Sequence, residues 1–143
     1  MSKIRNHNNV IRYLNTDLDI ESNQPFNKLV QCFKKMQLIE MHYCKNESGK
    51  IWSGCFEIEM ISPKSPELTP ELTISKFIKT LNGLSGEELK EWNRCKKKTF
   101  NIGYDCGKKP WAFTNSLPSP LIEKLNKHGL GIAITIYPER RKK

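Results

Sequence analysis

Alternation of polar and apolar residues marks the predicted strands of this chain. From Asp17 to Glu21 the alternation is strict, which is typical of a half-buried strand. Other segments are rich in strand-forming residues, and the polar stretch 45–50 between two of them predicts a hairpin turn. We therefore predict strands at residues 17–21, 38–44, 52–61, 100–104, 111–113 and 131–137.

Apolar residues at helical spacing predict four helices between these strands. Three of the helices begin near a proline, at Pro25, Pro70 and Pro120, because proline is favoured in the first turn. Ser85 and Glu88 have the spacing of a capping box, which predicts the start of another helix. The apolar stripes run over residues 26–33, 74–81, 89–95 and 121–125.

One spacing of apolar residues occurs twice, in Leu29, Val30, Phe33 and Leu38 and again in Leu121, Ile122, Leu125 and Leu130. Each set follows a proline-containing helix start and precedes a predicted strand. The repetition predicts two β-α-β halves. We therefore expect an α+β protein of the ferredoxin-like kind, a two-layer sandwich with a mainly antiparallel sheet and its helices on one face.

The composition fits one ordinary domain. Apolar residues make up 37% of the 143 residues and charged residues 27%, which suits one core and a polar surface. No apolar run approaches the roughly 20 residues of a membrane-spanning helix, and the start of the chain lacks the apolar stretch of a signal peptide. We expect a single cytoplasmic domain over 1–143 that makes no membrane contact. Its expected appendages are a flexible N-terminus (1–9), a Pro-rich connector (62–70) and a basic tail (139–143).

Five cysteines agree with a reducing compartment, since their number is odd: Cys32, Cys44, Cys55, Cys95 and Cys106. None of them forms the C-x-x-C pair with which one turn presents two thiolates to a zinc ion. The first three lie in apolar-patterned segments, where a free cysteine behaves as a small hydrophobe. We therefore predict core thiols and no structural zinc.

Three carboxylates, Asp17, Asp19 and Glu21, fall on one face of the first predicted strand. Oxygen ligands of this kind suit calcium or magnesium. Such ions, however, need ligands that converge from more than one segment, and a flat strand face does not converge. We therefore predict an exposed strand face whose carboxylates interact with nearby lysines, and no metal site.

Positive charge is concentrated in one part of the sequence. Six basic residues and one acidic residue lie between Arg94 and Lys109, in a chain of net charge +9. Trp111 and Phe113 follow directly. Lysines neutralise phosphates and aromatic rings stack on unpaired bases, so the pattern indicates a nucleic-acid-binding module as one alternative. A solvated basic face is the other, and it is the commoner role of such a run.

The loop around Asp105, Cys106 and Gly107 is the one candidate for local chemistry. Its glycines and lysines predict backbone amides that hold an anion, although the phosphate-loop pattern itself is absent. Cys106 becomes a candidate nucleophile if His42 or His128 approaches it, because nearby lysines lower a thiol pKa. The sequence does not bring these groups together, and we predict no catalytic set.

Three stretches carry a resemblance to a known group of proteins. They are Phe100 to Gly107, with its Asn-Ile-Gly-Tyr-Asp-Cys-Gly element, Pro110 to Phe113, and Gly131 to Pro138. Together with the opening Leu18-Asp19-Ile20, they resemble a group of small uncharacterised bacterial α+β proteins. Some domains of this general appearance are immunity proteins encoded beside secreted toxins. The resemblance implies a compact α+β domain and no established activity.

We therefore expect a non-enzymatic, cytoplasmic protein-binding domain without a cofactor, an immunity protein that neutralises a bacterial toxin by direct binding. Cationic and aromatic side chains concentrate binding energy at interfaces. The predicted partner-binding residues are Lys97, Lys98, Lys108, Lys109, Trp111 and Phe113. Nucleic-acid binding through 94–109 is the alternative function, and a small enzyme centred on Asp105 and Cys106 is a third. The sequence leaves the partner and the oligomeric state open.

Overall fold

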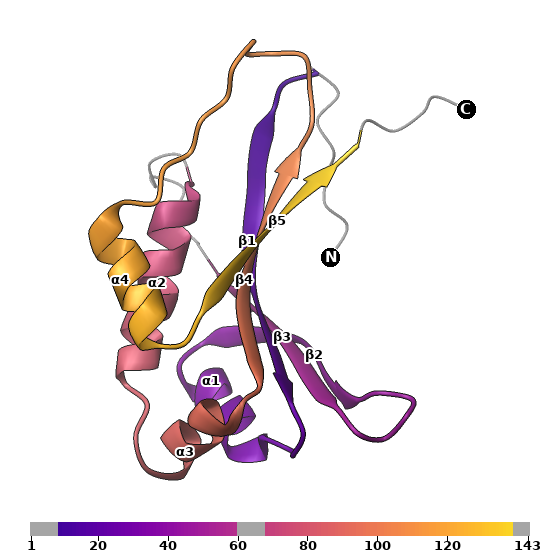
Figure 1. Ribbon diagram of the computed structural model, residues 1–143, viewed down its shortest axis with the longest axis vertical. Coiled ribbons are helices and arrows are strands. Elements are labelled where there is room, and N and C mark those ends of the chain that lie inside the picture. The colour runs from indigo at the N-terminus through magenta and orange to yellow at the C-terminus, as the bar shows by residue number, and fades with distance from the viewer. Residues whose placement is uncertain (1–8, 60–67, 139–143) are drawn as a thin grey trace.

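Five strands and four helices make up the computed structural model, which describes residues 9–59 and 68–138 (Figure 1). The predicted basic tail lies outside these residues, as do most of the predicted N-terminus and Pro-rich connector; Pro70 is the first residue of a helix. The elements follow one another as β1 (Arg12–Ser22), α1 (Asn27–Lys35), β2 (Leu38–Lys45), β3 (Trp52–Ile58), α2 (Pro70–Asn82), α3 (Gly86–Arg94), β4 (Lys97–Asp105), α4 (Ser119–Lys127) and β5 (Gly131–Tyr137).

The strands form one mixed, open sheet in the order β2-β3-β1-β4-β5. β1 lies at its centre and pairs antiparallel with β3 on one side and β4 on the other. β2 extends the sheet antiparallel to β3, and β5 extends it parallel to β4. The sheet is therefore mainly antiparallel, as predicted, with one parallel pair at its edge.

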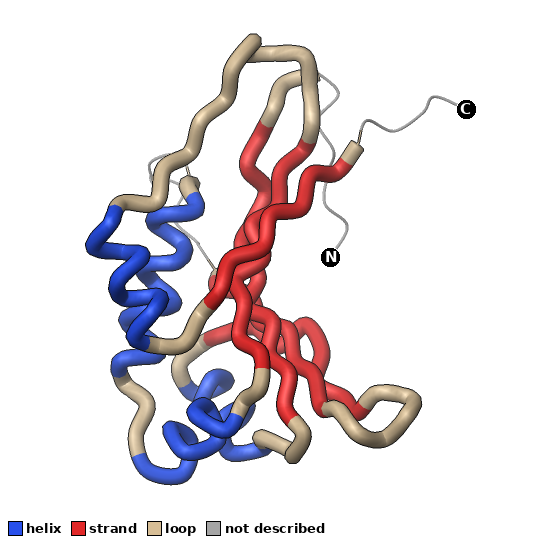
Figure 2. Tube along the Cα trace, in the orientation of Figure 1, coloured by secondary structure: helices blue, strands red, loops and turns tan. Residues whose placement is uncertain are grey.

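All four helices cover the same face of the sheet (Figures 1 and 2). α1 packs on α3 near one end of the strands, and α2 packs on α4 nearer the other. This arrangement follows from the strict alternation along β1, because Leu18 and Ile20 are buried toward the helices while Asp17 and Asp19 point to the opposite face. We call that opposite face, which no described helix covers, the open face.

Aromatic rings fill the layer between sheet and helices. Phe56 of β3 meets Phe33 of α1 with ring centroids 4.9 Å apart, and Phe100 of β4 meets Phe77 of α2 at 5.1 Å. All four rings have no exposed surface. Each such ring contributes a large apolar area to the core, so the two helix pairs are tied to the sheet at separate points.

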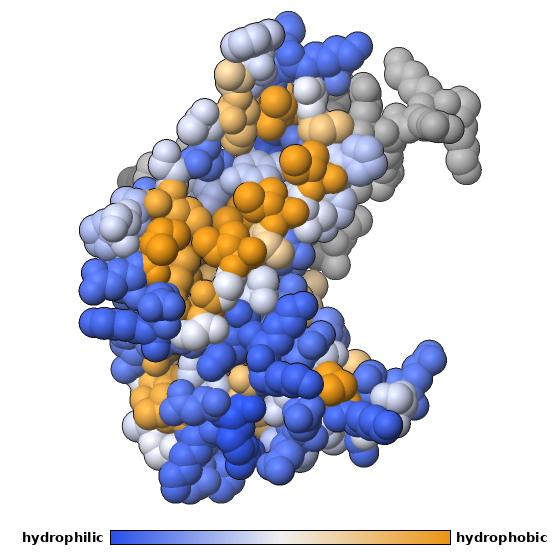
Figure 3. Space-filling view, viewed as in Figure 1, coloured by the Kyte–Doolittle hydropathy of each residue, from blue (hydrophilic) through white to orange (hydrophobic). Residues whose placement is uncertain are grey.

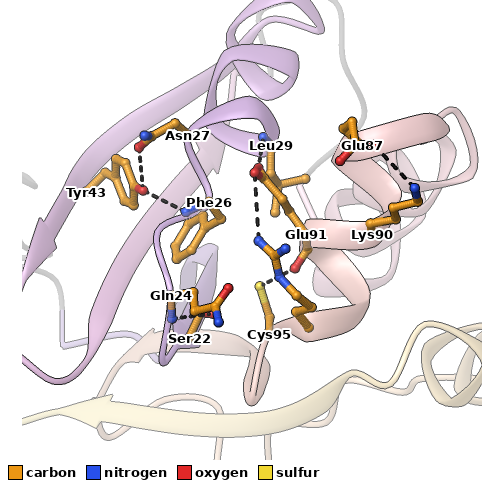
Figure 4. Close-up of polar contacts among 11 residues, drawn as sticks. Ser22, Gln24, Phe26, Asn27, Leu29, Tyr43, Glu87, Lys90, Glu91 and Cys95 are labelled. Carbon is orange, nitrogen blue, oxygen red and sulfur yellow. Dashed lines mark hydrogen bonds and ion pairs between the residues drawn. The ribbon is translucent and has the colours of Figure 1, made fainter.

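The start of α1 depends on side chains from other elements (Figure 4). Its N-cap residue is Phe26, which offers no capping side chain. Instead, Oε1 of Glu91 in α3 accepts the backbone N–H of Leu29 at 2.8 Å, and the Tyr43 hydroxyl in β2 accepts that of Phe26 at 2.8 Å. The carboxylate also lies at the positive end of the α1 dipole. These contacts join α1, α3 and β2 into one unit.

The predicted secondary structure is largely confirmed, although the strand predicted at 52–61 ends at Ile58, and residues 60–61 lie outside the described chain. Other predictions are wrong. Trp111 to Phe113 is a loop and not a strand. Ser85 is the N-cap of α3, but its side chain makes no capping hydrogen bond. Cys44 is exposed and not a core thiol, because it lies on the edge strand β2.

The two predicted β-α-β halves are not equivalent in the sheet. β4 and β5 are parallel neighbours joined through α4, as a simple β-α-β unit requires. β3 lies between β1 and β2, so the first half is interrupted. The strand order thus establishes an α+β fold with a five-stranded mixed sheet. Within residues 9–59 and 68–138, no helix has the length and apolar character needed to cross a bilayer.

Replacing Glu91 tests the support of α1. We expect Glu91→Ala to lower the free energy of unfolding by about 1–2 kcal/mol, because the Leu29 N–H loses its acceptor. Glu91→Gln keeps a carbonyl oxygen and should recover most of the loss. The control is Lys90→Ala, whose exposed contact with Glu87 should be worth less than about 0.5 kcal/mol. Urea unfolding of the three variants gives the comparison, and equal stability of Glu91→Ala and Lys90→Ala would contradict it.

Candidate functional site

β4 separates the predicted basic stretch into two groups. Lys97 and Lys98 begin the strand, whereas Lys108 and Lys109 follow its last residue, Asp105. The eight steps from Lys97 to Asp105, of about 3.3 Å each, make the strand between the two groups roughly 26 Å long. Four of the six predicted partner-binding residues, Lys108, Lys109, Trp111 and Phe113, therefore lie together beyond one end of the sheet, and the other two lie at the opposite end.

The Lys97 and Lys98 end of β4 makes contacts within the fold. Nζ of Lys98 donates to the backbone oxygen of Trp92 at 3.2 Å and lies 4.9 Å from the centroid of the Trp92 ring. Burial lowers the pKa of this ammonium. Lys97 lies opposite Glu21 in the β1–β4 ladder. Lys98 thus binds the last turn of α3, and its ammonium group is less available to a binding partner than its position in the sequence suggests.

The other end of β4 leads into residues 106–118, which we call the arm. The base of the arm is tied to the start of the described chain by backbone hydrogen bonds. Lys108 N donates to Asn9 O at 2.8 Å, and Ile11 N donates to Lys109 O at 2.7 Å. Gly107, just before these lysines, packs so closely that an added Cβ would lie 2.5 Å from Asn9 O. Glycine is required here for close approach of two backbones.

The backbone amides that were predicted to hold an anion form hydrogen bonds within the fold. The amides of Lys108 and Lys109 donate to Asn9 O, and the amide of Cys106 donates to Tyr137 O at 3.0 Å. Three amides of the predicted loop are therefore engaged with the fold and are not directed at a ligand. Asp105 is 4% exposed and lies opposite Arg12, whose Nη2 is 3.4 Å from Oδ2 of Asp105. Asp105 thus forms an ion pair that joins β4 to β1.

Tyr104 anchors the middle of the arm. Its ring packs edge-on against Phe113 with centroids 5.8 Å apart, and its hydroxyl accepts Nδ2 of Asn115 at 3.0 Å. A pocket of about 480 Å³ opens between this part of the arm and β5; its lining includes Tyr104, Cys106, Phe113, Asn115, Ile134 and Ile136. The polar groups of its lining also include the carboxylate of Asp105, and the rest of the lining is mostly apolar.

Trp111 projects from the arm between these two anchors. Its exposed fraction is 99%, the highest among the exposed large apolar residues of the described chain. The preceding Lys109–Pro110 peptide bond is cis, and both neighbouring lysines, Lys108 and Lys109, are exposed. A fully exposed indole on an anchored loop is the side chain that a binding partner would cover first.

Neither predicted histidine partner lies at Cys106. His42 lies opposite Cys55 in the β2–β3 ladder, and His128 ends α4, where its ring is 2.9 Å from Oδ1 of Asn82. Burial and the charges of Lys98 and Lys127 lower the pKa of His128. The described structure thus places His128 near the Lys98 end of β4 and Cys106 beyond the other end.

The open face is polar and carries the predicted row of carboxylates. Nδ2 of Asn15 donates to Oδ1 of Asp17 at 2.6 Å and to Oε1 of Glu57 at 3.1 Å. Burial raises the pKa of the neighbouring Cys55 thiol, and Asp17 and Asp19 raise it further. In residues 9–59 and 68–138 there is no set of three His, Cys, Asp or Glu side chains placed to hold a metal ion.

Sequence reasoning missed the exposed isoleucines of β5. Ile132, Ile134 and Ile136 are 39%, 64% and 64% exposed, and apolar side chains continue from α4 across β5 toward the arm (Figure 3). The alternation over 131–137 was a sufficient signal for a strand that is apolar on one face. Only the position of β5 at the edge of the sheet leaves that face uncovered.

Substitution of Gly107 tests how the arm is held. We expect Gly107→Ala to lower the free energy of unfolding by about 1–3 kcal/mol, since the new methyl group meets the backbone of Asn9 and Val10. Gly131→Ala is the matched control, because its added Cβ meets nothing closer than 3.9 Å. Hydrogen exchange of the Ile11 amide should speed up in Gly107→Ala only. Unchanged exchange there would contradict a rigid base.

The five thiols should differ in reactivity. Cys44 is exposed, Cys55 and Cys95 are buried, and burial raises the pKa of Cys95 to about 11. We expect a disulfide reagent at pH 8 to modify Cys44 first and the two buried thiols on the order of 100-fold more slowly. Cys44→Ser should remove the fast phase. A fast phase that survives in Cys44→Ser and disappears in Cys106→Ser would instead support the enzyme hypothesis.

Comparison with known proteins leaves the family of this chain open. No protein-family model matches it, and neither a curated protein nor a solved structure does. The resemblance to small bacterial α+β proteins is therefore still a prediction, and the function has to be argued from the arm and the surfaces beside it.

Proposed function

We propose that this protein is a non-enzymatic cytoplasmic binding domain that covers a surface of another protein, as an immunity protein covers a toxin. The observation that carries the proposal is the 99% exposure of Trp111 on an arm held at its base and its middle. Tryptophan is enriched among the residues that dominate binding energy. An indole that is fully exposed in the free protein can bury its whole apolar area on binding.

The attachment of the arm favours binding further. Ordering a loose loop on association costs free energy, and a loop that is already held avoids much of that cost. Backbone bonds to Asn9 hold the base, and the contacts of Tyr104 with Phe113 and Asn115 hold the middle. The arm thus presents Trp111 in a restricted set of positions.

Charge indicates the class of partner. Lys108 and Lys109 precede the indole by three and two residues, and the whole chain carries a net charge of +9. Complementary charge speeds encounter and rejects partners of the same sign. We therefore propose a partner with an acidic surface around an apolar pocket that receives Trp111.

Nucleic-acid binding is the second candidate, and the same arm supports it. An exposed indole that follows two exposed lysines in the chain can stack on an unpaired base while the ammonium groups neutralise phosphates. The protein partner is preferred because Tyr104 and Phe113 pack against each other instead of presenting further stacking faces.

We also propose a finer description of the fold, in which β1 to β4 form a ferredoxin-like unit and α4 and β5 are an addition to it. The order β2-β3-β1-β4, with every neighbour antiparallel, supports this assignment. The added strand would then account for the one parallel pair.

The test uses the whole protein as bait in a lysate of the organism that encodes it, with and without nuclease. We expect one stoichiometric protein that survives nuclease, and a loss of about 30-fold in its affinity with Trp111→Ala, which corresponds to about 2 kcal/mol. Leu72→Ala is the matched control, since Leu72 is an exposed apolar residue of α2. Partners that vanish with nuclease would move the assignment to nucleic acid, and equal binding by both variants would overturn the role of the arm.

A further inference from the structure

β5 is an edge strand, and in residues 9–59 and 68–138 no further strand pairs with it beyond β4. It pairs with β4 on one side and ends the sheet on the other. Its seven residues, Gly131–Tyr137, include no charged residue and no proline. Pairing with β4 shows no register shift. Exposed, regular and uncharged edges tend to pair with another strand, so natural proteins normally interrupt or cover them.

The opposite edge of the same sheet is protected. β2 carries Glu40, His42 and Lys45, and its register with β3 shifts between Glu40 and His42. Charges and a bulge are two of the devices that prevent edge pairing. The contrast within one sheet indicates that the β5 edge is kept open for a strand.

The exposed isoleucines of β5 all point to one face. Ile132, Ile134 and Ile136 lie beside Phe100, Ile102 and Tyr104 of β4, on the face that the helices cover. Ile134 and Ile136 are nevertheless 64% exposed, because the described helices do not extend over the edge. Burial of this apolar row against another strand is favourable, and the isoleucines are not buried in the single chain.

We infer that β5 pairs antiparallel with β5 of a second copy of this chain, with Ile134 facing Ile134 on the twofold axis. In that register Ile132 of one copy lies opposite Ile136 of the other. Directly opposed residues of antiparallel strands share a face, with Cβ atoms about 4.5–5.5 Å apart. The six isoleucines of the two copies then form one apolar cluster, and the two sheets become one of ten strands.

A second copy fits this edge better than a strand of opposite charge. β5 has no charged residue with which to select such a strand, and its alternation is complementary to itself about Ile134. A twofold axis needs a patch that complements itself, as this strand does. The paired strands bury less than the roughly 800 Å² per partner of a standard interface, so we expect a dissociation constant on the order of 10 µM.

The inference goes beyond the proposed function, because it uses no residue of the arm. The arm follows the Asp105 end of β4, which lies beside the Tyr137 end of β5. Antiparallel pairing places the two Tyr137 ends, and hence the two arms, at opposite ends of the shared strand pair. The dimer would present two copies of Trp111 to separate partners.

Sedimentation of the full chain from about 1 to 300 µM tests the inference. We expect a monomer–dimer equilibrium that Ile134→Lys weakens at least tenfold, because two ammonium groups would meet on the axis. Leu72→Lys adds the same charge to exposed α2 and should dimerise like the unaltered chain. Circular dichroism confirms that both variants are folded.

Two further measurements separate this inference from its alternatives. Added salt should strengthen the dimer, because it screens the repulsion between two copies that each carry +9. It should instead weaken the binding of an acidic protein or of nucleic acid. Trp111→Ala should dimerise normally, so failure of partner binding and failure of dimerisation are distinguishable. A monomer at 300 µM, or a dimer that Ile134→Lys leaves unchanged, would overturn the inference.

Discussion

The parallel pairing of β4 with β5 is the constraint from which the surface features follow. Parallel neighbours begin at the same end of a sheet, so a chain that leaves β4 at Asp105 has to travel back along the whole strand before Gly131. α4 covers only part of this return, about 13 Å over nine residues. The remainder is the arm, which is why a long, exposed segment with Trp111 projects beyond the sheet.

The same pairing leaves β5 at the edge, and this gives the molecule two apolar surfaces with different characters. On the arm, one exposed indole follows two lysines whose backbone is hydrogen-bonded to the start of the described chain. On β5, three isoleucines form a flat row along a regular strand without charge. The first surface suits a pocket in a partner, and the second suits another strand. The acidic open face, with Asp17 and Glu57 bridged by Asn15, adds a polar surface of opposite charge.

The local structure could be predicted from the sequence, because it is encoded over a few residues. The alternation around Leu18 and the proline before Leu121 determine a strand and a helix with little help from the rest of the chain. Lateral strand order is not encoded in this way, so the exposure of Cys44 and Ile134 could not be predicted. The grouping of Lys108 with Trp111, and its separation from Lys98, depends on the length of β4. The support of α1 by Glu91 joins residues 62 positions apart and leaves no trace in a short pattern.

The backbone bonds at the base of the arm also determine how the protein can be handled. Asn9 is bonded to Lys108, and Tyr137 is bonded to Cys106, so the described chain enters and leaves beside the arm. A fluorophore attached at Asn9 or Pro138 would therefore lie beside the surface that is proposed to bind. The β2–β3 turn around Gly49 lies at the other end of the sheet, since β3 pairs with the Ser22 end of β1. That turn is the position for a fluorophore or an immobilisation site that keeps the arm accessible.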